Sequence, residues 1–100
     1  MRDKSIISDL NKVFDSRIRL GIMSVLIVND RYDFNGFKEM LNVTDGNLAS
    51  HLKALEEKGL IEVNKQFIGR KPNTYYFITE QGVTLFKKHL KALEKLLKTQ

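Results

Sequence analysis

One stretch of the sequence decides the fold, and it reads VTDGNLASHLKALE over residues 43–56. Thr44 is a preferred N-cap residue, and Asp45 places a negative charge at the positive end of the helix that follows. Apolar residues then recur at helical spacing and predict a buried inner face made of Leu48, Leu52 and Leu55. The stretch therefore predicts an amphipathic helix whose start and buried side are both specified locally.

The residues on either side of this helix predict where it ends and which element precedes it. Gly59 is expected to end the helix in the left-handed backbone conformation. Upstream, residues 34–41 carry phenylalanine and leucine at positions i, i+3 and i+7, which predicts a helix of two turns. The Asn-Val pair that follows breaks this short helix before the next one starts. Residues 34–58 are therefore interpreted as a helix-turn-helix.

The outward face of the second helix holds the candidate DNA-reading residues. Steps of 100° per residue away from the leucines place Gly46, Asn47, Ser50 and Lys53 outward and His51 at the edge of this face. Thr44 is added because its hydroxyl lies at the positive start of the helix, where it could meet a phosphate. Asn47, Ser50 and His51 can hydrogen-bond base edges, and Lys53 suits a phosphate or a guanine. Gly46 is small enough to let the helix approach a duplex closely. We therefore expect this helix to enter the major groove of DNA.

Two considerations limit this interpretation. Glu56 and Glu57 lie on the same outward side and would repel phosphate, so contact is expected from the N-terminal half of the helix. The alternative is that the polar side chains form a solvated helix face with no partner. The segment that follows the helix helps to decide between a DNA-binding face and a solvated face.

A β-hairpin with a basic tip is predicted over residues 61–78. Ile61, Val63 and Phe67 share one face of an extended segment, residues 69–73 form a turn-rich loop, and residues 74–78 return as a strand. The candidate DNA contacts of this wing are Lys65, Gly69, Arg70, Lys71 and Asn73. No acidic residue occurs from position 63 to position 79. The tip suits phosphate contact or entry of an arginine into the minor groove, and its alternative is a solvated turn.

Three further helices are predicted around this unit. Residues 5–14 read as a short amphipathic helix, residues 16–28 as a central buried helix, and residues 79–98 as a terminal helix with an apolar heptad seam. The seam is wider than a small domain needs, so the terminal helices are expected to form a homodimer. The expected interface residues are Leu85, Phe86, His89, Leu90, Leu93, Leu96 and Leu97. The alternative is that both terminal helices fold back on their own domain.

The composition of the chain limits its fold class and the kinds of partner that it can bind. The chain has 100 residues, is 42% hydrophobic and 29% charged, and is expected to form a single domain over residues 1–100 rather than a disordered segment. Its fold class is predicted as mainly α with a small β-hairpin, that is, α+β. There are no cysteines, which excludes disulfides and cysteine-ligated metal, and the net charge of +5 favours polyanionic partners. No signal peptide or bilayer-spanning stretch is recognised, so we expect a cytoplasmic protein without membrane contact.

Several motifs in this order resemble the winged helix-turn-helix transcriptional regulators. They are RIRLGIM at 17–23, the stretch at 43–56, IGRKPNT at 68–74 and ITEQG at 78–82. The likeness covers roughly residues 12 to 97 and is greatest to the short single-domain proteins grouped with the MarR and ArsR families. The resemblance implies dimers that bind near-palindromic operators, usually as repressors. Metal-sensing ArsR relatives use cysteine or clustered histidine and carboxylate ligands, and this chain offers only His51 and His89, on different helices.

The sequence therefore predicts a double-stranded DNA-binding transcription regulator that acts as a homodimer and, by family resemblance, as a repressor. The alternative is a winged-helix module that contacts another protein through the same surface. No phosphate-binding glycine loop, nucleophile with a nearby base, or metal-ligand spacing is found, so we expect neither catalysis, cofactor nor metal. A small-molecule effector has room only at the dimer interface, where no polar cluster indicates one.

Overall fold

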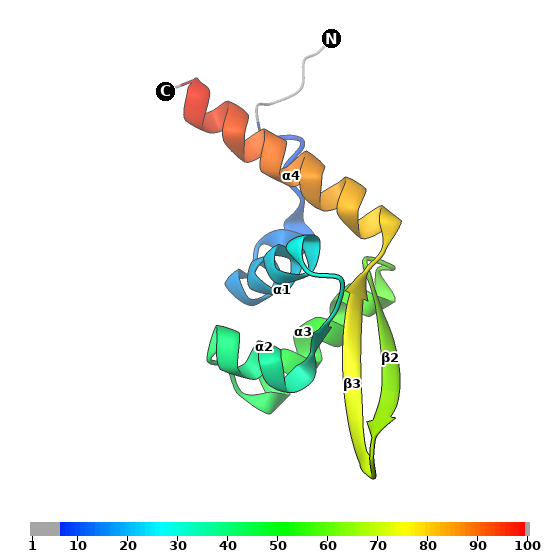
Figure 1. Cartoon of the computed structure of the whole chain (residues 1–100). Helices are drawn as coiled ribbons and strands as arrows, with labels where there is room; N and C mark the ends of the chain where they lie inside the picture. The colour runs from blue at the N-terminus through cyan, green and yellow to red at the C-terminus, as the bar shows by residue number, and fades with distance from the viewer. Residues whose placement is uncertain (1–6, 100) are drawn as a thin grey trace.

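The structure is a computed structural model and describes residues 7–99. A helical core carries a three-stranded antiparallel sheet on one side and a long terminal helix on top (Figure 1). In chain order the elements are a 3₁₀ turn (Lys12–Phe14), α1 (Arg17–Val28), β1 (Tyr32–Asp33), α2 (Phe34–Leu41), α3 (Asp45–Glu57), β2 (Ile61–Ile68), β3 (Lys71–Ile78) and α4 (Glu80–Lys98). This order confirms the predicted α+β winged-helix architecture.

The core of the molecule is built around α3, as its leucines predicted. Leu48, Leu52 and Leu55 are buried and join a single cluster with apolar side chains of α1, α2, β2, β3 and α4. The helix ends in a Schellman motif, in which Gly59 has a φ of +75° and the N–H of Leu60 donates to the carbonyl oxygen of Leu55 at 3.1 Å. The predicted inner face and left-handed ending of this helix are therefore confirmed.

A short strand immediately before α2 joins the sheet. Tyr32 and Asp33 form β1, which pairs with Tyr76 and Tyr75 of β3, so the strand order is β1-β3-β2. A strand of two residues is too short to show an alternating pattern. The side chain of Asp33 then caps α2 by accepting a hydrogen bond from the N–H of Gly36 at 2.8 Å. The strand thus fixes where the helix-turn-helix begins.

The wing spans the predicted residues, but its turn is tighter and its second strand longer than predicted. Only Gly69 and Arg70 form the turn, because Lys71 already pairs with Ile68 and the strand continues through Pro72. A positive φ at Gly69 alone is the pattern of a type II′ turn, which suits the twist of a hairpin. The proline is tolerated because β1 covers β3 only at positions 75 and 76, which leaves the edge at Pro72 open.

The expected helix at residues 5–14 is wrong. Positions 1–6 lie outside the described residues, positions 7–10 form turns, and helical structure is limited to the 3₁₀ turn Lys12–Phe14. Asn11 is extended, its side chain caps this turn at the N–H of Val13, and its own N–H donates to Nδ1 of His89 at 3.1 Å. A contact with such a distant residue overrides the local helical pattern.

The side of α4 that packs on the domain differs from the expected seam. Its buried residues are Gly82, Phe86, His89 and Ala92. Phe86 and His89 pack around the ring of Phe14, with ring centroids 5.2 and 4.9 Å away. The assignment of Phe86 and His89 to a dimer interface is therefore wrong, because the chain's own N-terminal segment covers them. Leu85 and Leu96 are half-buried, whereas Leu90, Leu93 and Leu97 are exposed.

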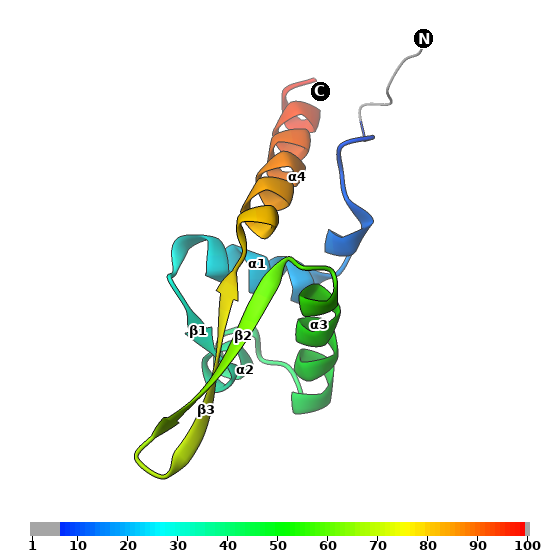
Figure 2. The ribbon, with the colours of Figure 1, turned by 90° about the vertical axis from the view of Figure 1, so that its right-hand side faces the viewer.

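The molecule is elongated because two elements extend beyond the core. Its principal extents are 58 × 25 × 21 Å, and its radius of gyration of 15.4 Å exceeds the ~13 Å expected for a compact chain of this length. The wing extends in one direction and the C-terminal half of α4 projects on the opposite side (Figure 2). Within residues 7–99, no helix combines the length and apolarity that crossing a bilayer requires.

Gly82 provides a test of the packing between α4 and the start of the sheet. A Cβ atom there would collide with the carbonyl oxygen of Leu60, which already accepts a hydrogen bond from the N–H of Thr79. We expect Gly82→Ala to lower the free energy of unfolding by about 1–3 kcal/mol or more, because backbone must move. In urea unfolding, Gly46→Ala is the matched control, since a Cβ at Gly46 meets nothing within 4 Å. Equal stability of the two variants would contradict this packing.

The buried His89 predicts a dependence of stability on pH. Burial lowers the pKa of His89 below its usual 6.5, and the nearby Asp15 carboxylate only partly opposes this. In acid the unfolded chain therefore takes up a proton before the folded chain does, so stability is full above about pH 6.5 and falls below it. We expect an NMR titration midpoint for the His89 ring below 6.5. The variant His51→Gln assigns the signal, and a midpoint above 6.5 would contradict the buried neutral ring.

Candidate nucleic-acid interface

The outward flank of α3 is open along its N-terminal half. Gly46, Asn47, Ser50 and Lys53 are all exposed, on the side opposite the buried leucines. Ala49 is exposed on the same half of the helix and was missed, although the same 100° steps would have included it. The flank therefore combines small residues, which allow close approach, with hydrogen-bonding and basic groups.

The turn before α3 sets how this flank is presented. Thr44 caps the helix, and its Oγ1 accepts a hydrogen bond from the N–H of Asn47 at 3.2 Å. Asn42 ends α2 in the left-handed conformation with a φ of 52°. Lys38 of α2 and Asp45 of α3 form an ion pair of 2.6 Å across the turn. The two helices are thus held at a fixed angle, and Thr44 remains exposed at the leading end of α3.

His51 has a structural contact that the sequence did not indicate. Its Nδ1 accepts a hydrogen bond from Nε of Arg19 on α1 at 3.0 Å, and Nη1 of Arg19 donates to the carbonyl oxygen of Val13 at 3.3 Å. Burial and, secondly, the positive charge of Arg19 lower the pKa of His51. The imidazole is therefore neutral near pH 7, and its Nε2 carries the proton as a donor at the edge of α3.

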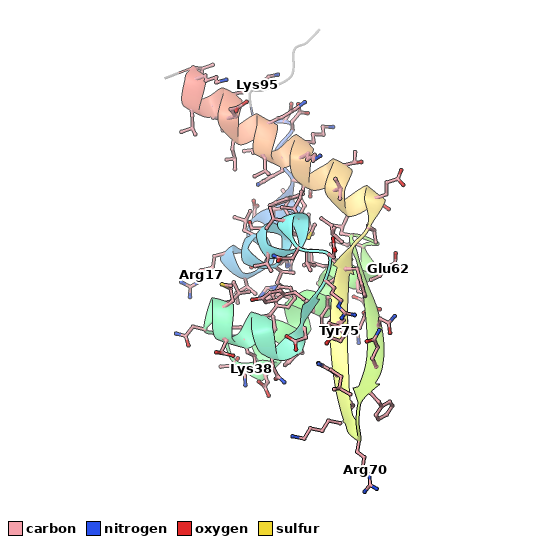
Figure 3. All side chains as sticks on the ribbon, viewed as in Figure 1. Arg17, Lys38, Glu62, Arg70, Tyr75 and Lys95 are labelled. Carbon is pink, nitrogen blue, oxygen red and sulfur yellow. The ribbon has the colours of Figure 1, made fainter. Side chains whose placement is uncertain are left out.

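The wing presents most of its predicted residues to solvent. Lys65, Gly69, Arg70 and Lys71 are exposed, and Figure 3 shows Arg70 at the free end of the hairpin. Asn73 behaves differently, because it lies in β3, is half-buried and donates from Nδ2 to the hydroxyl of Tyr75 at 3.4 Å. The wing is therefore a basic ribbon whose charges gather toward its tip.

Two further arginines lie near this surface and were missed. The guanidinium of Arg31 stacks over the ring of Tyr75 at 4.2 Å, a cation–π contact that fixes it beside the wing. No sequence signal could have found it, since the contact depends on the pairing of β1 with β3. Arg17 is exposed at the start of α1 and lines a shallow cavity of about 310 Å³ with Leu41 and Asn42, beside the turn between α2 and α3.

The start of α3 and the tip of the wing lie at the same end of the molecule. Figure 2 shows the start of α3 and the tip of the wing directed toward the end opposite α4. In Figure 3, Lys38 and Arg70 occupy this end and Lys95 the other. Glu56 and Glu57 are exposed at the far end of α3, so the part of its exposed face without acidic residues runs from Gly46 to Lys53. One linear polyanion can therefore touch both elements.

The titratable groups of the described region do not gather into a metal centre. Within residues 7–99, no three histidine, aspartate or glutamate side chains are placed so that they could hold a metal ion. His51 and His89 are each committed to hydrogen bonds through Nδ1, to Arg19 and to Asn11.

Comparison with known proteins agrees with this geometry. The model of the winged helix DNA-binding domain matches residues 18–97. An uncharacterized protein of Methanocaldococcus jannaschii is 40% identical over 87 residues, which cover 87% of this chain and 95% of that protein. The structure of a transcriptional regulator homologue from Pyrococcus horikoshii OT3 superposes with a TM-score of 0.76 at 32% identity, over 91% of this chain and 95% of the other.

More distant structures share the fold alone. The zinc-responsive MarR family member ZitR of Lactococcus lactis superposes with a TM-score of 0.67 at 21% identity, over 89% of this chain and 60% of that one. The expected resemblance to winged helix-turn-helix transcriptional regulators is thus confirmed, and the likeness to the MarR family member is one of fold.

Proposed function

Because the chain belongs to the family of winged helix DNA-binding domains, we propose that it binds double-stranded DNA in a sequence-specific way and regulates transcription. The observation that carries the proposal is the placement of an open, polar flank of α3 and a basic wing at one end of the molecule. The fold and family are those of transcriptional regulators, and no catalytic role is proposed.

In this proposal α3 enters the major groove by its N-terminal half. Gly46 and Ala49 let the helix approach the base edges, and Asn47 and Ser50 supply hydrogen-bonding groups for reading them. Lys53 contacts a phosphate or a guanine. The exposed start of the helix, with its positive dipole end, meets a backbone phosphate near Thr44. Glu56 and Glu57 lie toward the opposite end of α3 and stay clear of the duplex.

The wing supplies the second contact of the proposal. Lys65 and Lys71 approach phosphates, and Arg70 at the tip reaches the adjacent minor groove. Arg31, held on the ring of Tyr75, adds a phosphate contact at the base of the wing. These contacts position the domain, while α3 distinguishes the sequence.

A homodimer is the second part of the proposal. Leu90, Leu93 and Leu97 form one stripe on the half of α4 that projects beyond the core, and the chain leaves this stripe exposed. Such a stripe fits the same stripe of a second copy. Two wings and two reading helices related by a two-fold axis would bind a near-palindromic operator, with half-sites about 34–36 Å apart. The likeness to MarR regulators favours repression by such a dimer in the cytoplasm, without cofactor or metal.

A gel-shift series in rising salt tests DNA binding, on a duplex selected from a random pool. Binding should weaken steeply with salt, and Arg70→Ala should lower the slope of log affinity against log salt by about one. Asn47→Ala should lose roughly 1–3 kcal/mol on the selected duplex and little on a random one, because it removes a base contact.

Lys95→Ala is the matched control for this series, since it removes one positive charge at the far end of α4. Affinity and salt slope should stay at the wild-type values. If Arg70→Ala and Asn47→Ala also bind like wild type, the proposed contacts are wrong. If the wild type binds no duplex at low salt, the surface belongs to a protein-contact module instead.

Sedimentation at micromolar concentration tests the dimer. The wild type should have about twice the monomer mass of 11.6 kDa. Leu93→Glu should sediment as a monomer, because it places a charge in the leucine stripe, whereas Lys91→Glu on the exposed polar side of the same helix should remain a dimer. A wild-type monomer, or a Leu93→Glu dimer, would remove this part of the proposal.

A further inference from the structure

The tip of the wing carries apolar side chains that the fold does not use. Phe67 is 74% exposed and Ile68 is 58% exposed, at the end of β2 just before the turn at Gly69 and Arg70. Apolar side chains that stay exposed to solvent contribute little to the stability of the fold. Phosphate contact by a hairpin tip does not require an aromatic ring either. The tip is therefore both basic and apolar.

The register of the hairpin explains how these side chains come to be exposed. Phe67 pairs with Pro72 and lies on the same face of the ribbon as Ile61 and Tyr76, which are buried. That face is supported by the core only near the base of the wing. Ile68, the next residue of β2, lies on the opposite face and is likewise beyond the reach of the core. Beyond the pairing of Asn64 with Tyr75, four more residue pairs continue outward, a reach of about 13 Å.

The positive charge around the tip restricts the kind of partner that the tip can bind. Lys65, Arg70 and Lys71 surround Phe67 and Ile68 in the sequence, all three are exposed, and no acidic residue occurs from position 63 to position 79. The partner must therefore combine a dense negative charge with an apolar surface. Because the tip points to the same end as the reading flank of α3, the partner that α3 binds is also within its reach.

We propose that the tip of the wing enters the minor groove as an apolar wedge, with Phe67 on one face of the ribbon and Ile68 on the other, partly unstacks one base step and bends the DNA. This inference rests on the proposed function and adds a mode of recognition to it. The bases offer apolar faces between anionic phosphates, which matches the chemistry of the tip. The wedge acts best at a flexible pyrimidine–purine step, so it selects sequence by deformability rather than by hydrogen bonds.

Fluorescence resonance energy transfer across an end-labelled duplex tests the wedge. The probe is a duplex selected from a random pool, with 2-aminopurine placed in turn at its pyrimidine–purine steps. The wild-type full chain should bend this duplex by about 20–90° and raise the 2-aminopurine fluorescence at one step. The double variant Phe67→Ala, Ile68→Ala should bind severalfold more weakly, leave the duplex straight and produce no fluorescence increase.

Two controls separate the wedge from other effects. Val28→Ala, at an equally exposed apolar residue on α1, should bend the duplex as the wild type does. The double variant should keep the wild-type salt slope, because it removes no charge, whereas Arg70→Ala should lower that slope.

The other possible results of these experiments each contradict the wedge, the proposed function or both. A wild type that binds the duplex without bending it, or a double variant that bends it equally, overturns the wedge and leaves DNA binding intact. A wild type that binds no duplex overturns the proposed function and the wedge together. If the wild type leaves the duplex straight but binds vesicles of phosphatidylserine and phosphatidylcholine through Phe67, the tip is a lipid contact instead.

Discussion

Burial of the leucines on one side of α3 is the constraint on which the rest of the structure depends. Leu48, Leu52 and Leu55 together contribute roughly 5–9 kcal/mol of transfer free energy, comparable with the whole net stability of a small domain, ~5–15 kcal/mol. With this side fixed inward, the opposite flank can face only solvent. The residues on that flank are therefore free to serve recognition, because the fold makes no demand on them.

The contacts around α3 connect it to both ends of the chain. Arg19 joins the ring of His51 on α3 to the carbonyl oxygen of Val13 in the N-terminal segment. That segment is in turn held under α4 by Phe14 and by the hydrogen bond from Asn11 to His89. The position of α3 thus depends on elements that lie next to the exposed leucine stripe of α4. The proposed dimer would therefore be linked to the position of α3 through one continuous set of contacts.

Local signals account for what could be predicted from the sequence. A capping threonine, a left-handed glycine and leucines at helical spacing lie within a few residues of one another, so α3 and its ends were predicted correctly. The predictions were wrong where the structure depends on contacts between residues that are distant in the sequence. The helix expected at residues 5–14 is replaced by turns because Asn11 bonds a histidine that lies 78 positions away. The expected interface on α4 was partly wrong because Phe14 of the N-terminal segment covers Phe86 and His89, and the pattern of one helix does not show which segment packs against it.

The same distinction between local patterns and contacts with distant residues applies to the candidate site. The exposed residues of α3 and the wing could be predicted, since outward positions follow from the inward ones. The roles of Arg31 and His51 could not, because each depends on a partner in another element, Tyr75 and Arg19. The exposure of Phe67 was equally hidden, since a strand pattern does not show where the core beneath it ends.

The most direct test of the central claim is an NMR titration of the full chain with a duplex, followed through its backbone amide signals. The account predicts that the signals that move form two groups, residues 44–53 on α3 and residues 65–73 on the wing, while those of residues 87–98 on α4 stay in place. Movement centred on the lysines of α4, with the signals of α3 and the wing unchanged, would contradict it.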